Sequence, residues 1–293
     1  MNAPLLERAP AKVNLTLSVL GHRDDGLHGL ESLVVFAQVA DQLTFSPGGP
    51  LKLEVSGPFA DACGTSSDNL VLRAADALAD EFDGLALGRF GLMKMLPVAA
   101  GLGGGSADAA AALRLLARAY DLAFDDGRIL SAARRTGADV SVCLDPRTRL
   151  MYGAGELLST PLRLPSLAAV LVNPGMPLPT GDVFAAFDRQ ADRSPRSGSG
   201  GHHSRIPREQ TELIAFLRGC GNDLEAAAIS LQPAIAELLA ELRATAGCLL
   251  ARMSGSGATC FGIYQSYAAA EAACRALGNR SSRWVRATML GAS

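Results

Sequence analysis

The chain has 293 residues, of which 48% are hydrophobic and 19% charged, and its formal net charge is −2 at pH 7. This length and composition predict a globular protein of two domains and exclude a broadly disordered chain. The near-neutral charge argues against a nucleic-acid-binding protein, and no apolar run approaches the roughly 20 residues of a membrane span.

The N-terminus lacks the basic-then-apolar layout of a signal peptide, so we expect a cytoplasmic protein. The six cysteines lie mostly in apolar stretches, without a CxxC pair or a histidine at metal-ligand spacing. We therefore expect reduced core thiols and no metal held by the protein alone. Lysine is rare: Lys12, Lys52 and Lys94 are the only lysines among the 27 lysine and arginine residues. A lysine in this chain is therefore a mild indication of a role that arginine would not fill.

The N-terminal part of the chain reads as β-structure. Apolar and polar residues alternate over residues 11–20, which predicts a half-buried strand with Lys12 and Asn14 on its polar face. The turn signal Asp25-Gly26 leads into a second predicted strand at residues 32–39. Further strands are predicted at residues 42–46 and 51–56.

Helices then alternate with strands. Ser66, Ser67 and Asp68 are N-cap candidates for a helix over residues 69–82. The later predicted elements follow in chain order: a strand at 89–96, helices at 107–120 and 128–136, strands at 150–152 and 168–172, and helices at 233–245 and 267–277. The pattern predicts a mixed α+β protein.

Prolines 161 and 165 separate two of these strands and suggest a domain boundary near residue 160. We therefore expect an N-terminal domain over residues 1–160 and a C-terminal domain over 161–293. Residues 192–208 are rich in Ser, Gly, Arg, Pro and His, and such a segment buries too little apolar surface to offset its ordering entropy. We expect a mobile surface loop there.

The most specific motif is Gly-Leu-Gly-Gly-Gly-Ser-Ala-Asp at residues 101–108, between a predicted strand and an alanine-rich helix. Glycines allow a close approach of the backbone to an oxyanion, and the unpaired N–H groups and dipole of a helix start favour phosphate. Neither a dinucleotide fingerprint nor a P-loop fits, because Ser106 and Ala107 stand where those motifs require other residues. A hinge is the alternative for a bare glycine-rich turn, and the adjoining long helix favours an anion site.

Two further features are weaker. Residues 254–259 form a second glycine cluster between apolar segments, which by itself is typical of an ordinary tight turn. Asp139 follows Gly137 and precedes an apolar run, where most aspartates are helix caps or surface charges. A buried Asp139 beside a cation would have the properties of a general base.

Together these motifs resemble the GHMP kinase superfamily over nearly the whole chain. The resemblance rests on six segments: residues 9–15, 21–28, 97–108, 137–140, 222–225 and 254–259. The triple glycine favours the branch of the superfamily that acts on a diphosphocytidyl substrate, since mevalonate and homoserine kinases tend to read Gly-Leu-Gly-Ser-Ser-Ala. The resemblance implies a two-domain α+β fold, with an N-terminal domain like domain 2 of ribosomal protein S5 and a ferredoxin-like C-terminal domain.

The resemblance also implies an activity, the ATP-dependent phosphorylation of the 2-hydroxyl of 4-diphosphocytidyl-2-C-methylerythritol, with Mg²⁺ accompanying ATP. Asp139 would be the catalytic base and Lys12 its partner, with Asn69 and Lys94 near the nucleotide. The ATP phosphates would be wrapped by one continuous segment: Pro97, Val98, Ala99, Ala100, Gly101, Leu102, Gly103, Gly104, Gly105, Ser106 and Ala107.

By the same resemblance, Asn14, His28, Thr180 and Phe184 would line the acceptor pocket. Phe184 would stack on the cytosine and His28 would bond its edge, although core packing is the common reading of a lone phenylalanine. The chain has Leu27 where the family usually has a stacking tyrosine, so one expected partner of the base is missing.

Two alternatives remain at this stage. One is a GHMP kinase acting on mevalonate or homoserine, and the other is an inactive GHMP-fold binding protein. The presence of both Lys12 and Asp139 argues against a pure binder, because binding needs no base. The expected partners are small-molecule substrates, without nucleic acid or membrane, and the expected state is a monomer or a weak homodimer.

Overall fold

The protein is described by a computed structural model, which covers residues 3–63, 68–82, 84–191, 206–278 and 283–291. The chain forms two compact units, each built from segments that alternate along the sequence. Unit 1 comprises Met1–Lys12, Val39–Val98 and Gly103–Pro146, and unit 2 comprises Val13–Gln38, Ala99–Leu102 and Arg147–Ser293. The single domain boundary expected near residue 160 stays a prediction. Of the loop expected over residues 192–208, the part from 192 to 205 lies outside the described residues.

The chain carries eleven strands in the described ranges: β1 (Leu5–Asn14), β2 (Ser18–His22), β3 (His28–Pro47), β4 (Lys52–Ser56), β5 (Gly88–Met93), β6 (Arg149–Gly153), β7 (Leu157–Leu158), β8 (Leu167–Asn173), β9 (Cys248–Met253), β10 (Cys260–Tyr264) and β11 (Trp284–Leu290). The helices there are a short 3-10 turn at Asp61–Cys63 and α1 (Leu70–Ala79), α2 (Gly104–Ala119), α3 (Gly127–Thr136), α4 (Val140–Leu144), α5 (Thr180–Ala191), α6 (Gln210–Gly219), α7 (Glu225–Leu231), α8 (Ala234–Ala244) and α9 (Tyr267–Leu277).

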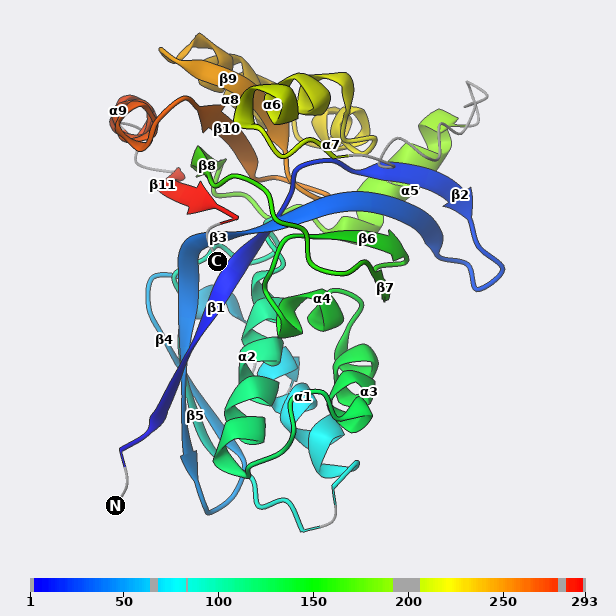
Figure 1. Cartoon of the computed structure of the whole chain (residues 1–293), viewed down its shortest axis with the longest axis vertical. Helices are drawn as coiled ribbons and strands as arrows, with labels where there is room; N and C mark the ends of the chain where they lie inside the picture. The colour runs from blue at the N-terminus through cyan, green and yellow to red at the C-terminus, as the bar shows by residue number, and fades with distance from the viewer. Residues whose placement is uncertain (1–2, 64–67, 83, 192–205, 279–282, 292–293) are drawn as a thin grey trace. The chain divides into compact units, whose positions relative to one another are not determined.

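In unit 1, the helices α1, α2, α3 and α4 pack together, as Figure 1 shows. The strand order there is β4-β5-β3, with β5 antiparallel to the C-terminal half of β3 and parallel to β4. Phe45 and Phe90 are directly opposed in this register, and their ring centroids lie 4.7 Å apart in the core. Helix α2 is buried along most of its length, because its small alanines let α1 and α4 approach closely.

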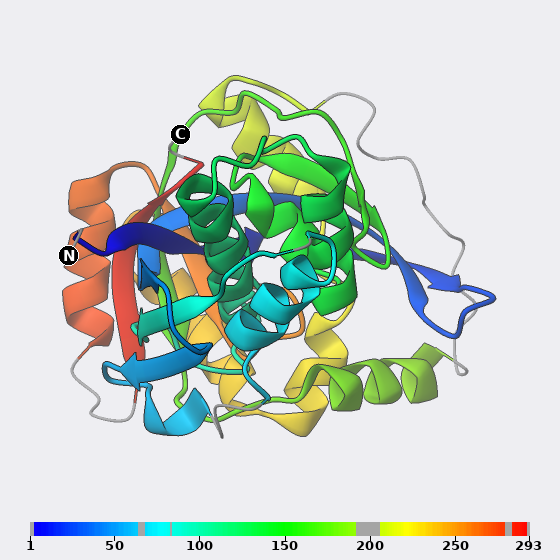
Figure 2. The same ribbon diagram turned by 90° about the horizontal axis from the view of Figure 1, so that it is seen from below.

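In unit 2, the N-terminal half of β3 pairs with β2 and β6, and the strand order continues from β3 through β11, β8 and β10 to β9. Strand β8 is buried on both faces, which explains its continuous apolar sequence. Helix α8 packs on β9 and β10, and α9 lies along β11, where Figure 2 shows the orange helix beside the red strand. Val170, Val172 and Tyr264 belong to the hydrophobic core of this unit.

Some expectations from the sequence need correction. The strand predicted over residues 11–20 is divided into β1 and β2, and it is not half-buried, since Lys12 and Asn14 are only 4% and 1% exposed. The N-cap of α1 is Asn69, whose side-chain oxygen accepts the N–H of Val71 at 2.9 Å. Ser66 and Ser67 lie outside the described residues, and Asp68 is not the cap.

The cysteines are all free, as expected, but only Cys143 and Cys260 are buried, so the other four are not core thiols in the strict sense. Helix α2 begins at Gly104 rather than at residue 107, so two glycines of the motif belong to the helix itself. No helix within the described ranges is both long and apolar enough to cross a bilayer.

Candidate active site

The start of α2 has the features of an anion site. Gly103 is its N-cap residue, with a φ of 60° in the left-handed region that favours glycine, and it offers no side-chain acceptor to the helix. The first turn contains no acidic residue. The N–H groups at a helix start lack intrahelical partners, and no side chain of this first turn offers a carboxylate to them. The turn can therefore bind an anion through its backbone.

Each glycine of this helix start also lies against another part of unit 1. A β-carbon placed on Gly103 would lie 3.2 Å from Lys12 Cε, and one on Gly104 would lie 3.1 Å from Lys94 Nζ. At Gly105 the nearest atom would be a methyl carbon of Leu70, at 3.4 Å. The glycines thus bring two lysines close to the helix start.

Lys12 and Asp139 form an ion pair in unit 1. The Lys12 ammonium lies 3.0 Å from Asp139 Oδ2, with 5% of the lysine side chain and 34% of the aspartate side chain exposed. Asp139 precedes α4 as its N-cap residue, yet its side chain accepts no capping hydrogen bond and contacts Lys12 instead. A carboxylate that is partly open to solvent and held beside a buried ammonium can accept a proton from a bound molecule.

Lys94 belongs to a second, fully buried cluster in unit 1. Its ammonium donates to Asp41 Oδ2 at 2.5 Å and to Asp108 Oδ2 at 2.6 Å, and all three side chains are less than 5% exposed. Asp41 Oδ1 also accepts the backbone N–H of Met95 and that of Leu96. The cluster therefore ties β3, the end of β5 and the first turns of α2 together.

Burial is the largest single influence on the pKa values of Lys94 and Asp108 in this cluster. It raises the pKa of Asp108 to about 7, although the ammonium of Lys94 acts in the opposite direction. For Lys94, burial would lower the pKa, but the two carboxylates outweigh it and leave the pKa raised. Asp108 Oδ1 is buried without a hydrogen-bond partner among the described residues.

The other residues expected around the nucleotide in unit 1 are placed as follows. Asn69 caps α1, and that helix packs on α2. Ser106 is half-buried in the first turn of α2 and Ala107 is buried, its N–H donating to the Gly103 carbonyl. Pro97 and Val98 lead from β5 toward the glycine run.

In unit 2, the two glycine clusters lie against each other. Ser254 Oγ donates to the Gly101 carbonyl at 3.0 Å, and the N–H of Thr259 donates to the Ala100 carbonyl at 3.1 Å. A β-carbon on Gly101, whose φ is 72°, would lie 2.8 Å from the nitrogen of Gly257. Residues 99–102, which include Ala99 and Leu102, are therefore held in shape by the second cluster, and glycine at 101 is required by this contact.

Asn14 and Thr180 adjoin that second cluster. The backbone N–H of Asn14 donates to Ser254 Oγ, and its amide nitrogen donates to Ser32 Oγ at 2.7 Å. Asn14 Oδ1 is buried and lacks a partner among the described residues. The hydroxyl of Thr180 lies 2.8 Å from that of Ser256. Asn14 thus offers a buried acceptor that a ligand donor could satisfy.

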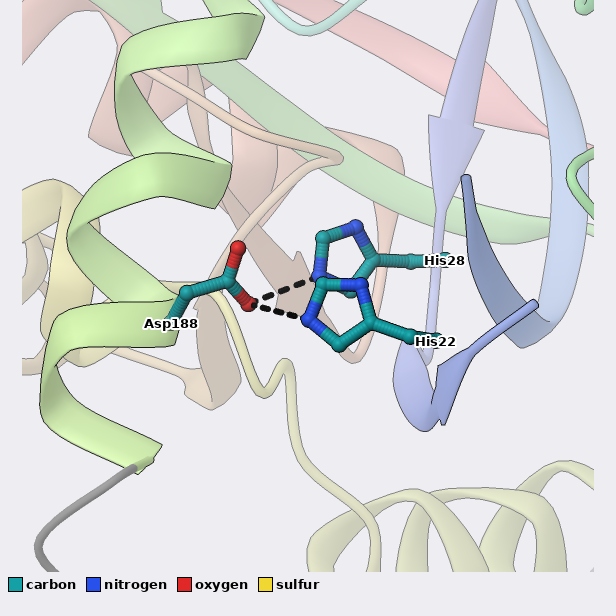
Figure 3. A group of neighbouring side chains, drawn as sticks. All are labelled: His22, His28 and Asp188. Carbon is teal, nitrogen blue, oxygen red and sulfur yellow. Dashed lines mark hydrogen bonds and ion pairs between the residues drawn. The ribbon is translucent and has the colours of Figure 1, made fainter. Parts of the chain in front are cut away.

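His28 and Phe184 contact each other in unit 2. Their rings are stacked with centroids 4.7 Å apart, and His28 Nε2 lies 2.7 Å from Asp188 Oδ1 (Figure 3). Phe184 is partly buried against the core of unit 2, while Leu27 is 52% exposed. One face of Phe184 is therefore already covered by His28.

Several residues of these clusters were not among the sequence-predicted site residues. Asp41 carries no local signal, because it meets Lys94 across 53 positions of the chain. Asp108 belongs to the glycine motif but was not assigned a role. Ser254 belongs to the second glycine cluster, which by itself indicated only a tight turn. Asp188 follows Phe184 by one helical turn, a spacing that places both on one face of α5.

Comparison with known proteins agrees with these features. The model of the GHMP kinases N-terminal domain matches residues 69–145, and that of the GHMP kinases C-terminal region matches residues 208–282. A solved 4-(cytidine 5'-diphospho)-2C-methyl-D-erythritol kinase is 35% identical, covers 99% of this chain and 100% of its own, and superposes with a TM-score of 0.78. A mevalonate kinase from L. major, 17% identical with a TM-score of 0.71, shows the shared fold alone.

Relatives of full length give a finer placement. A 4-diphosphocytidyl-2-C-methyl-D-erythritol kinase from Methylobacterium radiotolerans is 53% identical over 290 residues, covering 98% of this chain and 99% of its own. One from Rhodopseudomonas palustris is 50% identical over 297 residues, covering 96% and 95%. The expected α+β fold and kinase family are thereby confirmed. The chain belongs to the GHMP kinase family, within its branch of 4-diphosphocytidyl-2-C-methyl-D-erythritol kinases.

Proposed function

We propose that this chain transfers the terminal phosphoryl group of ATP to the 2-hydroxyl of 4-diphosphocytidyl-2-C-methyl-D-erythritol. The full-length relatives named for this reaction support the substrate. The observation that carries the mechanism lies within unit 1, where the Lys12–Asp139 pair adjoins the glycine-rich start of α2. A pure binding protein would need the anion site but no carboxylate beside it.

The start of α2 binds the ATP phosphates in this proposal. Gly104, Gly105 and Ser106 supply backbone N–H groups, and the absence of β-carbons at Gly103 and Gly105 lets phosphate oxygens approach them. Phosphoryl transfer depends mainly on positioning and on neutralising charge on the moving group. The buried Lys94 cluster supports this site indirectly, because it anchors the first turns of α2 to β3 and to the end of β5.

Asp139 acts as the general base. As the substrate 2-oxygen forms its bond to the γ-phosphorus, its proton passes to the Asp139 carboxylate, and the bond from that phosphorus to the bridging oxygen breaks to release ADP. The Lys12 ammonium, 3.0 Å from Asp139, stabilises the ionised carboxylate before transfer and offsets the charge on the phosphoryl oxygens during it.

Mg²⁺ accompanies ATP in this proposal. It prefers oxygen ligands and commonly keeps several waters while binding phosphates and one or two carboxylates. The hydroxyl of Ser106 in the first turn of α2 provides such an oxygen donor. The ion would neutralise phosphate charge, and Ser106 would hold it.

Asn14, His28, Thr180 and Phe184 recognise the acceptor. The buried Asn14 Oδ1 has no donor among the described residues, so an acceptor hydroxyl can satisfy it. In the complex, His28 moves off the face of Phe184 that it covers here, so that Phe184 stacks on the cytosine and His28 bonds the edge of the base. With Leu27 in place of the family tyrosine, the base is clamped by one aromatic ring rather than two.

The substrate is tested by phosphoryl transfer from radiolabelled ATP to three acceptors: the diphosphocytidyl alcohol, mevalonate and homoserine. We expect labelled product from the first acceptor alone, and Asp139→Asn is the matched negative control. A label preferring mevalonate or homoserine would overturn the substrate. No transfer to any acceptor by the wild type, despite ATP binding, would favour an inactive binding protein.

A further inference from the structure

Three side chains of unit 2 converge beside the turn of the β2–β3 hairpin. His22 and His28 are directly opposed in the register of β2 and β3, and Asp188 reaches them from α5 (Figure 3). Asp188 Oδ1 lies 2.7 Å from His28 Nε2 and 3.4 Å from His22 Nε2. Directly opposed side chains on antiparallel strands are close neighbours, so the hairpin register itself places the two rings together.

The spacing of these atoms is that of a metal site. One ligand atom from each residue lies within 4.8 Å of the others. A zinc ion about 2.0–2.2 Å from each ligand in a tetrahedral arrangement holds the ligand atoms about 3.3–3.6 Å apart. The His22–Asp188 distance of 3.4 Å already matches, and His28 and Asp188 would separate by about 0.7 Å to admit the ion.

The surroundings suit a divalent cation. His28 is 11% exposed and stacked on Phe184, which fixes its ring, whereas His22 is 62% and Asp188 37% exposed, so solvent reaches the fourth position. The nearby cation Arg23 is neutralised by Glu156 at 2.5 Å and Asp25 at 3.0 Å. Two neutral imidazoles and one carboxylate are a usual set of zinc ligands with a water completing the tetrahedron.

We propose that His22, His28 and Asp188 bind one Zn²⁺ ion per chain, with water as the fourth ligand. His28 cannot ligate zinc through Nε2 and bond the acceptor base through the same atom. Resting on the proposed function, this predicts that zinc inhibits the kinase in competition with the diphosphocytidyl alcohol and not with ATP.

Binding is tested first, without any substrate. Chelator-stripped full-length protein is titrated with Zn²⁺ by calorimetry near pH 7.5, and with Co²⁺ by visible absorption. We expect one equivalent with tetrahedral cobalt bands, and His22→Ala should weaken zinc binding at least about tenfold, since even the loss of an outer-shell partner costs 10- to 100-fold. Asp188→Asn should weaken it similarly.

The matched control replaces the other two histidines of the chain, His202→Ala with His203→Ala, and should bind zinc as the wild type does. Undiminished binding by His22→Ala and Asp188→Asn, loss of binding in the control, or a sulfur-to-cobalt charge-transfer band would overturn the site.

Inhibition is tested second, in the kinase assay. Zinc should raise the KM for the diphosphocytidyl alcohol in the wild type and leave it unchanged in His22→Ala, whose exposed side chain has no part in the proposed reaction. Zinc that binds at this site without raising that KM would overturn the competition. Failure of the chain to phosphorylate this alcohol would reject the proposed function and leave the binding result intact.

Discussion

Lys12 and Lys94 offer a comparison within unit 1, because both are nearly buried, both contact carboxylates and both lie against glycines at the start of α2. Their carboxylates differ. Asp139, beside Lys12, is 34% exposed, whereas Asp41 and Asp108, beside Lys94, are 0% and 4% exposed. Only the first carboxylate can meet a substrate.

This difference separates the carboxylate that is proposed to act in catalysis from the carboxylates that stabilise the fold. The oxygens of Asp41 are occupied by Lys94 and by two backbone N–H groups, so that carboxylate is committed to the fold. Among the described residues, Lys12 is the polar partner of the Asp139 side chain, which leaves one carboxylate oxygen to accept a proton. We therefore expect these similar ion pairs to serve different ends, with the exposure of the acid deciding which.

The largest expected effect on stability comes from Lys94→Met. It leaves two carboxylates buried without their cation, and removing one partner of a buried ion pair costs about 3–5 kcal/mol. Urea unfolding measures this loss. Lys52→Met is the matched control, because Lys52 and Glu54 are both more than half exposed and such a pair contributes about 0–1 kcal/mol. Equal losses in the two variants would show that the Lys94 cluster does not support the fold.

A smaller effect is expected in the pH dependence of stability. The pKa of Asp108 is about 7 in the folded chain, against an ordinary value of 3.8. Between these values the folded chain holds a proton that the unfolded chain releases, so this group's contribution to stability falls as the pH rises from about 4 to 7.

Relative to Asp108→Asn, the wild type should therefore gain up to about 1.4 kcal/mol of unfolding free energy per unit as the pH drops from 7 to 5. Denaturant unfolding at a series of pH values measures the two slopes. Identical slopes in wild type and variant would contradict the raised pKa.

The smallest expected change in stability is accompanied by a change in ATP binding. Alanine in a helix is about 0.5–1 kcal/mol more favourable than glycine, and a β-carbon on Gly105 would meet only a methyl carbon at 3.4 Å. Gly105→Ala should therefore slightly raise the melting temperature and yet weaken ATP binding, because a β-carbon at this position hinders the close approach of phosphate to the backbone. Gly127→Ala, at the start of α3 with open space around it, should raise stability alone. Equal ATP affinity in both variants would argue against the phosphate site.

The sequence predicted those parts of the site that local patterns encode. Glycines joined to an alanine-rich helix predicted an anion site, and the motifs around Lys12 and Asp139 were assigned by family resemblance. Their contact at 3.0 Å is compatible with that assignment, although their chemical parts remain predictions. The fold class followed from the same motifs.

Other parts depend on contacts between distant segments. Asp41 meets Lys94 across 53 positions, and His28 meets Asp188 across 160, so no local pattern joins them. The alternation around Lys12 indicated an exposed face, but tertiary packing buries it. Propensity also placed the start of α2 too late, because glycines are poor helix formers and packing overrides that preference here.

The most direct test of the account is the single-turnover rate of Asp139→Asn with ATP and the diphosphocytidyl alcohol both saturating, since this measures the transfer step apart from binding and product release. We predict a rate at least about 100-fold below wild type, the usual contribution of a general base, with unchanged ATP affinity. A wild-type rate in this variant would contradict the claim that the exposed carboxylate beside Lys12 performs the chemistry.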